Sequence, residues 1–118
     1  VHDPVAHADM ASWYAAADVY LSTSRREGSN YSLIEALSCG CAPAVSDIPP
    51  HRAIVGSLAA PFAVGDAHAA AEAIVAASTL PRAAASAHRI STSVGRRLPG
   101  KLRDVYSTLA YARVVNIA

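Results

Sequence analysis

The sequence lacks several features that mark particular classes of protein. Its net charge is only +1, so no overall positive field suggests binding to nucleic acid. No apolar run approaches the roughly 20 residues of a membrane-spanning helix. The first residues have neither the basic nor the apolar region of a signal peptide. The chain also begins at Val1 without an initiating methionine, so we expect a fragment or a processed piece.

Patterns for metal binding and disulfide scaffolds are missing as well. Cys39 and Cys41 are the 2 cysteines, and their spacing does not match a zinc site. The 5 histidines are scattered without the spacing of metal ligands. We therefore expect no metal and no cofactor, and a reduced, cytoplasmic setting fits the two thiols.

Apolar residues make up 53% of the 118 residues, enough for one small domain with its own core. We treat residues 1–118 as a single domain. Its C-terminal quarter is basic, with one acidic residue, Asp104. This segment predicts a solvated helix face or, less favoured, contact with an anionic membrane at the inner face or with an acidic partner. The basic residues counted there are Arg82, Arg89, Arg96, Arg97, Lys101, Arg103 and Arg113.

The order of apolar segments predicts an α/β fold. Residues 5–17 carry a rough helical stripe, and Asp18–Thr23 and Ala42–Ser46 have the composition of buried strands. A polar loop and a helix over Tyr31–Ser38 lie between those strands. This is the βαβ unit of a Rossmann-like parallel sheet with flanking helices. Gly40 suits a helix C-terminus that requires a positive φ.

The second half predicts mainly helices. Pro49 and Pro50 predict a rigid turn that forbids continued helix or sheet. One helical turn follows at His51–Val55, and residues 61–64 form a weak third strand. Asp66 is the expected N-cap of an Ala-rich helix to about Thr79. Further helices are expected over residues 81–91 and 101–115.

The loop and helix between the first two strands carry the candidate chemistry. A helix that begins near Tyr31 directs its unpaired amide groups and the positive end of its dipole into the loop, which suits phosphate. Gly28 permits a close approach of ligand and backbone. Glu35 could accept hydrogen bonds from sugar hydroxyls. Glu27, on the loop, could hold a transferred group or stabilise positive charge that develops there.

A structural alternative exists for the same residues. The sequence from Ser32 to Glu35 also fits a capping box, in which Ser32 caps the helix and Glu35 reaches back to it. From the residues alone the two alternatives are about equally favoured, because short motifs match often by chance.

A longer pattern extends from this stretch into both strands. Its elements are Ala17-Asp18-Val19, Ser24, Glu27-Gly28, Leu33-Ile34-Glu35-Ala36-Leu37, Gly40, Pro43 and Val45-Ser46-Asp47. The pattern resembles the nucleotide-sugar-binding domain of GT-B glycosyltransferases, and of glycosyltransferase family 4 in particular. That family has two glutamates separated by seven residues and transfers hexoses with retention. The resemblance covers about Val5 to Thr79, and implies the C-terminal portion of the donor domain, with its first strands and the N-terminal acceptor domain absent.

The resemblance implies a role for each polar residue of the loop. Glu35 would bind the ribose, and Glu27 would contact the donor sugar at the reacting centre as the catalytic residue. The donor would be a UDP-, GDP- or ADP-linked sugar, bound without metal. Members of the family often have Pro at position 32, which places Ser32 inside the helix and disfavours the capping box. The predicted substrate-binding residues are Ser24, Gly28, Ser29, Asn30, Tyr31, Ser32, Leu33 and Glu35.

The chain departs from the family pattern at several positions. Ser29-Asn30-Tyr31 replaces an aromatic or glycine version of the loop, so the donor sugar is not implied. Pro49-Pro50 replaces a pair of glycines, and Ala53 replaces an acidic residue. The basic residues that neutralise the diphosphate in the family would precede Val1. Arg25 and Arg26 are nearby cations, with a loop role and a phosphate role equally favoured.

Two functions follow from these observations. The first is a glycosyltransferase fragment, inactive alone, whose absent N-terminal domain supplies a glycan or lipid acceptor. The second is a non-catalytic interaction module that uses the basic segment. A nucleotide-binding domain of another α/β family is a weaker third, since it would leave Glu35 without a role. An exposed edge strand would also favour self-association.

Overall fold

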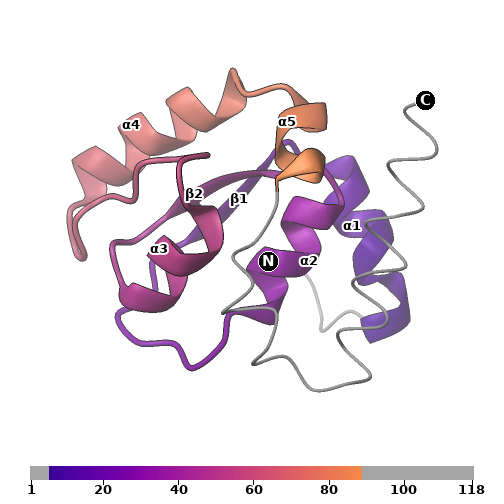
Figure 1. Cartoon of the computed structure of the whole chain (residues 1–118), viewed down its shortest axis with the longest axis horizontal. Helices are drawn as coiled ribbons and strands as arrows, with labels where there is room; N and C mark the ends of the chain where they lie inside the picture. The colour runs from indigo at the N-terminus through magenta and orange to yellow at the C-terminus, as the bar shows by residue number, and fades with distance from the viewer. Residues whose placement is uncertain (1–5, 89–118) are drawn as a thin grey trace.

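The computed structural model describes residues 6–88 (Figure 1). The predicted helix at residues 101–115 lies outside this range, as does the basic segment apart from Arg82. The elements in chain order are η1 (His7–Asp9), α1 (Met10–Ala16), β1 (Val19–Ser22), α2 (Tyr31–Ser38), β2 (Ala42–Val45), α3 (Pro49–Val55), α4 (Ala67–Ser78) and α5 (Arg82–Ala87).

The two strands form a parallel pair between two layers of helix (Figure 1). Val19 pairs with Ala42 and Ser22 with Val45, so both strands end at the same edge of the sheet. Helix α4 packs on one face, and α2 and α5 pack on the other, with α1 against α2. This confirms the predicted α/β fold with a parallel, Rossmann-like sheet. The weak third strand is reduced to one parallel bridge between Ser46 and Phe62.

The two faces of the sheet are filled in different ways. Leu33 and Leu37 of α2 meet Val45 of β2 in a core of branched side chains. Burial of each such side chain stabilises the fold by roughly 2 kcal/mol. On the other face, Ala77 of α4 packs against Ala42 and Ala44 of β2. Small residues on both sides let this helix lie close to the strands.

Pro49 and Pro50 do not form the predicted helix-forbidding turn. They are the first two residues of α3. Proline is tolerated there because its missing N–H would have no partner inside the helix. The expected single turn at His51–Val55 is therefore part of a seven-residue helix that buries Ile54 and Val55.

Helix α2 ends as the sequence predicted, at Gly40 with φ +83°. The amide of Gly40 donates to the carbonyl of Leu37 at 2.9 Å, and that of Cys41 donates to Ala36 at 2.9 Å. These two bonds define a Schellman motif. A Cβ on residue 40 would lie 3.4 Å from atoms of Arg82. The backbone conformation therefore favours glycine, and a Cβ there would come into contact with Arg82.

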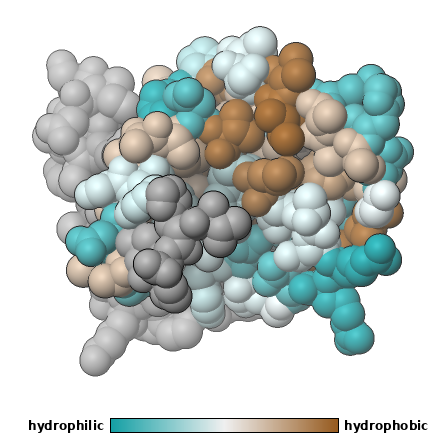
Figure 2. All heavy atoms as spheres, turned by 180° about the vertical axis from the view of Figure 1, so that it is seen from behind, coloured by the Kyte–Doolittle hydropathy of each residue, from teal (hydrophilic) through white to brown (hydrophobic). Residues whose placement is uncertain are grey.

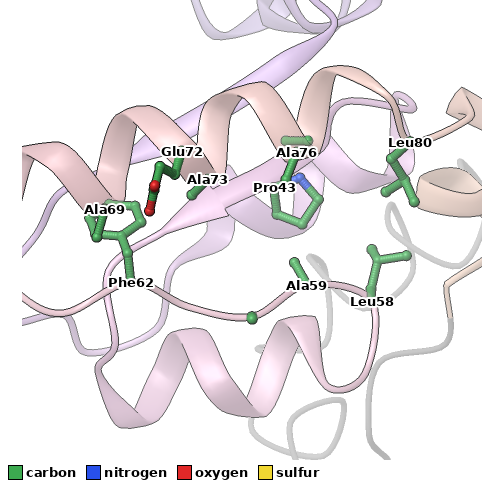
Figure 3. Close-up of a pocket in the computed structure, with 11 residues that line it drawn as sticks. Pro43, Leu58, Ala59, Phe62, Ala69, Glu72, Ala73, Ala76 and Leu80 are labelled. Carbon is green, nitrogen blue, oxygen red and sulfur yellow. The ribbon is translucent and has the colours of Figure 1, made fainter.

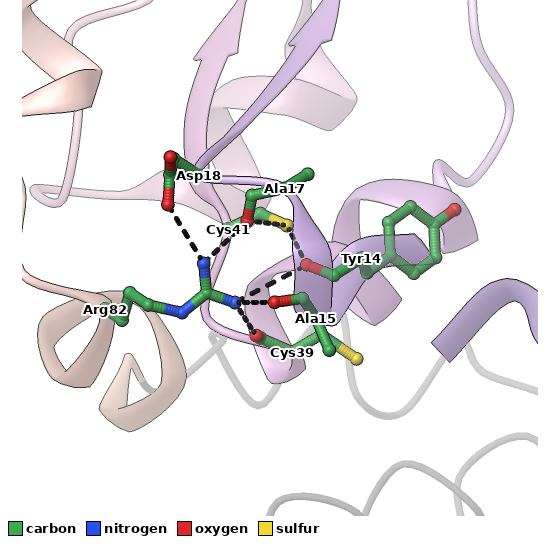
Figure 4. A network of polar contacts seen from close by, with 7 residues as sticks. All are labelled: Tyr14, Ala15, Ala17, Asp18, Cys39, Cys41 and Arg82. Carbon is green, nitrogen blue, oxygen red and sulfur yellow. Dashed lines mark hydrogen bonds and ion pairs between the residues drawn. The ribbon is translucent and has the colours of Figure 1, made fainter. Parts of the chain in front are cut away.

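Arg82 joins the ends of helices that are far apart in the sequence (Figure 4). Its guanidinium donates to the carbonyls of Ala17 at 2.6 Å, Ala15 at 2.8 Å and Cys39 at 3.0 Å. It also contacts the Asp18 carboxylate at 3.3 Å. Since these bonds occupy the guanidinium, Arg82 does not belong to the basic surface that the sequence predicted.

The surface of the described residues includes large apolar side chains. Figure 2 shows such residues gathered on the side opposite to the view of Figure 1. Leu21 of β1 is an exposed apolar residue, with 48% of its surface accessible. Asp18 and Ser22 direct their carbonyls to the amides of Ala42 and Ser46 on the β2 side, so the main-chain groups of Leu21 face the other edge. Self-association through this edge stays a prediction. No described helix has the length and apolarity to cross a bilayer.

Candidate functional site

The loop over residues 23–30 leaves the carboxyl end of β1 and leads into α2. The Ser24 hydroxyl donates to Oε1 of Glu27 at 2.7 Å. Hydrogen bonds to an ionised carboxylate are short and strong, so this bond fixes one orientation of Glu27. The Ser22 and Ser24 hydroxyls are 3.3 Å apart. The predicted catalytic carboxylate is therefore held by the start of its own loop.

Asn30 begins the helix as its N-cap. Its Oδ1 accepts from the amide of Leu33 at 3.1 Å, and its φ of −82° excludes a left-handed conformation. The helix starts at Tyr31, so Ser32 is its second residue. The capping box is therefore wrong, because Asn30 occupies the cap position. The prediction that Ser32 lies inside the helix is confirmed, one position later than the N1 position favoured by the family pattern.

Only some of the first backbone amides of α2 donate a hydrogen bond. Leu33 donates to Asn30, and Tyr31 donates to the carbonyl of Ser29 at 3.0 Å. Within residues 6–88, the structure gives the amide of Ser32 no partner. Gly28 and Ser29, just ahead, are exposed, and a Cβ on Gly28 would meet no atom within 4 Å. This end of α2 therefore has an open approach and an amide that could donate to an anion.

Glu35 lies one turn further along α2, and its side chain is 27% exposed. Its Oε1 lies 4.0 Å from Nε2 of His7, whose side chain is 84% exposed. That contact is too long and too exposed to fix the carboxylate. Glu35 thus has an accessible carboxylate beside the helix start, as a ribose-binding residue would require.

Tyr20 of β1 lies beside the cap of α2. Burial raises the pKa of its hydroxyl above the ordinary 10.0, and the charges of Glu27 and Glu35 raise it further. The hydroxyl stays protonated at neutral pH and donates to Oδ1 of Asn30 at 3.4 Å. The strand β1 and the start of α2 are thus joined at Asn30.

Sequence reasoning gave no role to His51, which the structure places in the centre of this region. Its side chain is fully buried, and its ring contacts Asn30, Ser22 and Ser46. One signal could have identified it. His51 follows β2 closely, and parallel strands place the loops at their carboxyl ends side by side. A histidine there is expected near the loop after β1.

The two arginines of the loop differ in their surroundings. Arg25 lines a hollow of about 300 Å³ between the loop and the start of α4, and its guanidinium lies near Gly65. Arg26 is exposed and makes no side-chain hydrogen bond or ion pair within residues 6–88. Arg25 is therefore directed at the α4 side of the loop, and a phosphate role for either arginine stays a prediction.

A larger hollow of about 420 Å³ lies away from the loop, between α4 and residues 58–62 (Figure 3). Its lining includes Pro43, Phe62 and Leu80, and Glu72 is its single charged residue. It contains no residue of the stretch from Ser24 to Glu35. Such an apolar hollow offers few groups for a diphosphate, so the candidate site remains at the start of α2.

Metal binding is a separate matter. Among the described residues, no group of three or more His, Cys, Asp or Glu side chains is placed to hold a metal ion. Cys39 and Cys41 are buried, and the Cys41 thiol donates to the carbonyl of Tyr14 at 2.9 Å. Binding without a metal stays a prediction.

A family model described as Glycosyl transferases group 1 matches residues 1–79. The chain belongs to this family. In this group 1 glycosyltransferase the matched residues include both strands, the loop, α2, α3 and α4, and end at Thr79 as the resemblance predicted. No curated protein and no solved structure matches the chain.

Proposed function

We propose that this group 1 glycosyltransferase chain is the donor-binding part of a retaining enzyme of glycosyltransferase family 4. In this proposal residues 1–118 are the C-terminal portion of the nucleotide-sugar domain. The observation that carries it is the start of α2, where a capped helix with an available amide carries Glu35 and follows a loop in which Ser24 holds Glu27. A nucleoside diphosphate sugar has the matching groups, which are hydroxyls at both ends and phosphates between them.

Each residue would have a distinct role. The exposed backbone at Gly28 and Ser29 and the available amide of Ser32 would receive the diphosphate, where the helix dipole favours negative charge. Glu35 would accept hydrogen bonds from the ribose hydroxyls. Glu27 would contact the donor sugar, and its carboxylate would stabilise the positive charge that develops at the anomeric carbon. An acceptor domain, which we place outside this chain, would bring the glycan or lipid acceptor.

Titration of the 118-residue chain with UDP-glucose, GDP-mannose and ADP-glucose by calorimetry tests donor binding. We expect one of the three to bind, and Glu35→Gln to weaken it by about tenfold, because a hydrogen bond to a charged group contributes about 1.5–3 kcal/mol. The control is Glu72→Gln, which removes the same charge from the exposed face of α4.

Equal affinity of the Glu35→Gln and Glu72→Gln variants would contradict the role of Glu35. Retention has its own measurement. In a longer enzyme with an acceptor domain, NMR of the glycoside should show the anomeric configuration of the donor. An inverted product would contradict the placement in family 4.

A further inference from the structure

The side chain of His51 is fully buried, and it contacts three polar residues. Its Nδ1 is 2.8 Å from the carbonyl oxygen of Ser46 and 3.3 Å from the Ser46 hydroxyl. Its Nε2 is 2.9 Å from Nδ2 of Asn30 and 3.5 Å from the Ser22 hydroxyl. The imidazole therefore lies between the end of β1, the end of β2 and the cap of α2.

These partners determine which ring nitrogen carries the proton. A carbonyl oxygen can only accept, so Nδ1 of His51 donates to Ser46. Oδ1 of Asn30 already accepts from the Leu33 amide, so its amide nitrogen faces the ring and donates to Nε2. A neutral imidazole with its proton on Nδ1 satisfies both contacts.

The same network fixes both ends of the loop. The Ser46 hydroxyl donates to the carbonyl of Ser24 at 2.6 Å, next to the hydrogen bond that holds Glu27. At the other end, the bond from Asn30 to His51 keeps Oδ1 turned toward Leu33. If Nε2 were absent, the Asn30 amide could rotate and leave the start of α2 uncapped.

We propose that His51 is a positioning residue of the donor site, a role that rests on the proposed function. It acts through Asn30 and Ser46 and does not itself touch the donor. Its neutral Nδ1–H form sets the orientation of the Asn30 amide, and hence the start of α2 and the loop that carries Glu27.

Two substitutions separate positioning from packing. In His51→Gln the new amide oxygen stands close to the place of Nε2 and can still accept from Asn30. In His51→Asn the new amide stands close to Nδ1 and can donate to Ser46, but it does not reach Asn30. The readouts are hydrogen exchange of the Leu33 amide and the affinity for UDP-glucose, GDP-mannose and ADP-glucose. The Ala69 amide, capped by Asp66 in α4, is the internal control.

In His51→Asn we expect the Leu33 amide to exchange about fivefold faster, the effect of a lost cap, with Ala69 unchanged. Donor affinity should fall in parallel, and His51→Gln should restore both. Equal exchange at Leu33 in the two variants, or equal acceleration at Leu33 and Ala69, would overturn the role because it would indicate packing alone.

Nitrogen NMR of the unsubstituted chain adds a test that depends on no variant. It should show a protonated Nδ1 and an unprotonated Nε2 on His51, and a proton on Nε2 would overturn the proposal. A chain that binds none of the three nucleotide sugars would count against the proposed function. The nitrogen shifts and the Leu33 exchange would still decide whether His51 orients Asn30.

Discussion

Two polar clusters lie at opposite ends of the same pair of strands. The Arg82 cluster, which comprises Arg82, Asp18 and the carbonyls of Ala15, Ala17 and Cys39, precedes the strands (Figure 4). The His51 cluster, which comprises Ser22, Ser24, Asn30, Ser46 and His51, follows them. Each cluster joins segments that are distant in the sequence. The two clusters differ in the type of group that accepts or donates the hydrogen bonds.

Arg82 bonds mainly to main-chain carbonyls, which every residue possesses. These bonds provide donors for carbonyls at the ends of α1 and α2 and position no reactive side chain. The Arg82 cluster therefore stabilises the fold. The His51 cluster is built from side chains, and it connects to Glu27 and to the start of α2. At the carboxyl end of the sheet, the buried polar side chains are hydrogen-bonded to one another and lie next to accessible carboxylates. Ligand sites in α/β sheets occur at this same end.

The largest expected effect is on stability at the Arg82 cluster. Arg82→Met keeps the length of the side chain but leaves several carbonyls without their donor. We expect a loss of about 3 kcal/mol in the free energy of unfolding, since hydrogen bonds to charged groups contribute about 1.5–3 kcal/mol each. Urea denaturation followed by circular dichroism measures it, with unchanged donor affinity in the folded fraction.

Arg52→Met is the matched control, because Arg52 makes an exposed ion pair with Asp47. Such pairs contribute about 0–1 kcal/mol. Similar losses from the two arginine substitutions would show that the carbonyls of Ala15, Ala17 and Cys39 do not depend on Arg82.

The next effect concerns two side-chain N-caps, which differ in residue type and in their surroundings. Asn30 caps α2 inside the His51 cluster, whereas Asp66 caps α4 in solvent. Asn30→Ala removes the cap and also leaves Nε2 of His51 without its donor, so we expect a loss of about 2 kcal/mol, against about 1 kcal/mol for Asp66→Ala. Urea denaturation of both variants provides the comparison. A larger loss from Asp66→Ala would contradict the importance of the His51 cluster.

The smallest effect is on the pH dependence of stability. Burial raises the pKa values of Tyr14 and Tyr20 in the fold above the ordinary value of 10.0. Between the unfolded and folded pKa values the folded chain holds more protons. The free energy of unfolding should therefore fall as the pH rises above about 10, and be unaffected by these groups below it. Tyr20→Phe should reduce that fall. An unchanged pH profile in this variant would contradict the burial of its hydroxyl.

The sequence predicted the elements whose causes are local. The βαβ unit, Gly40 at the end of α2 and Asp66 at the start of α4 follow from composition, backbone conformation and capping chemistry. The pair Glu27 and Glu35 was named from the family resemblance together with the loop and helix around it, and its role stays a prediction.

Long-range contacts could not be predicted in the same way. Arg82 looked like part of a basic surface, yet it bonds to Ala17, which is 65 positions away. His51 looked like an isolated histidine, and its partners become visible only once the strands are paired. Pro49 and Pro50 fit both a turn and a helix start, and the sequence-based prediction chose the wrong alternative.

One measurement tests the central claim most directly. Amide NMR spectra of the 118-residue chain can be recorded during titration with UDP-glucose, GDP-mannose and ADP-glucose. The account predicts that one of them shifts the amides from Gly28 to Glu35, while those beside the Arg82 cluster, from Ala15 to Asp18, stay in place. Shifts confined to the Arg82 cluster, or to the hollow beside α4, would contradict it.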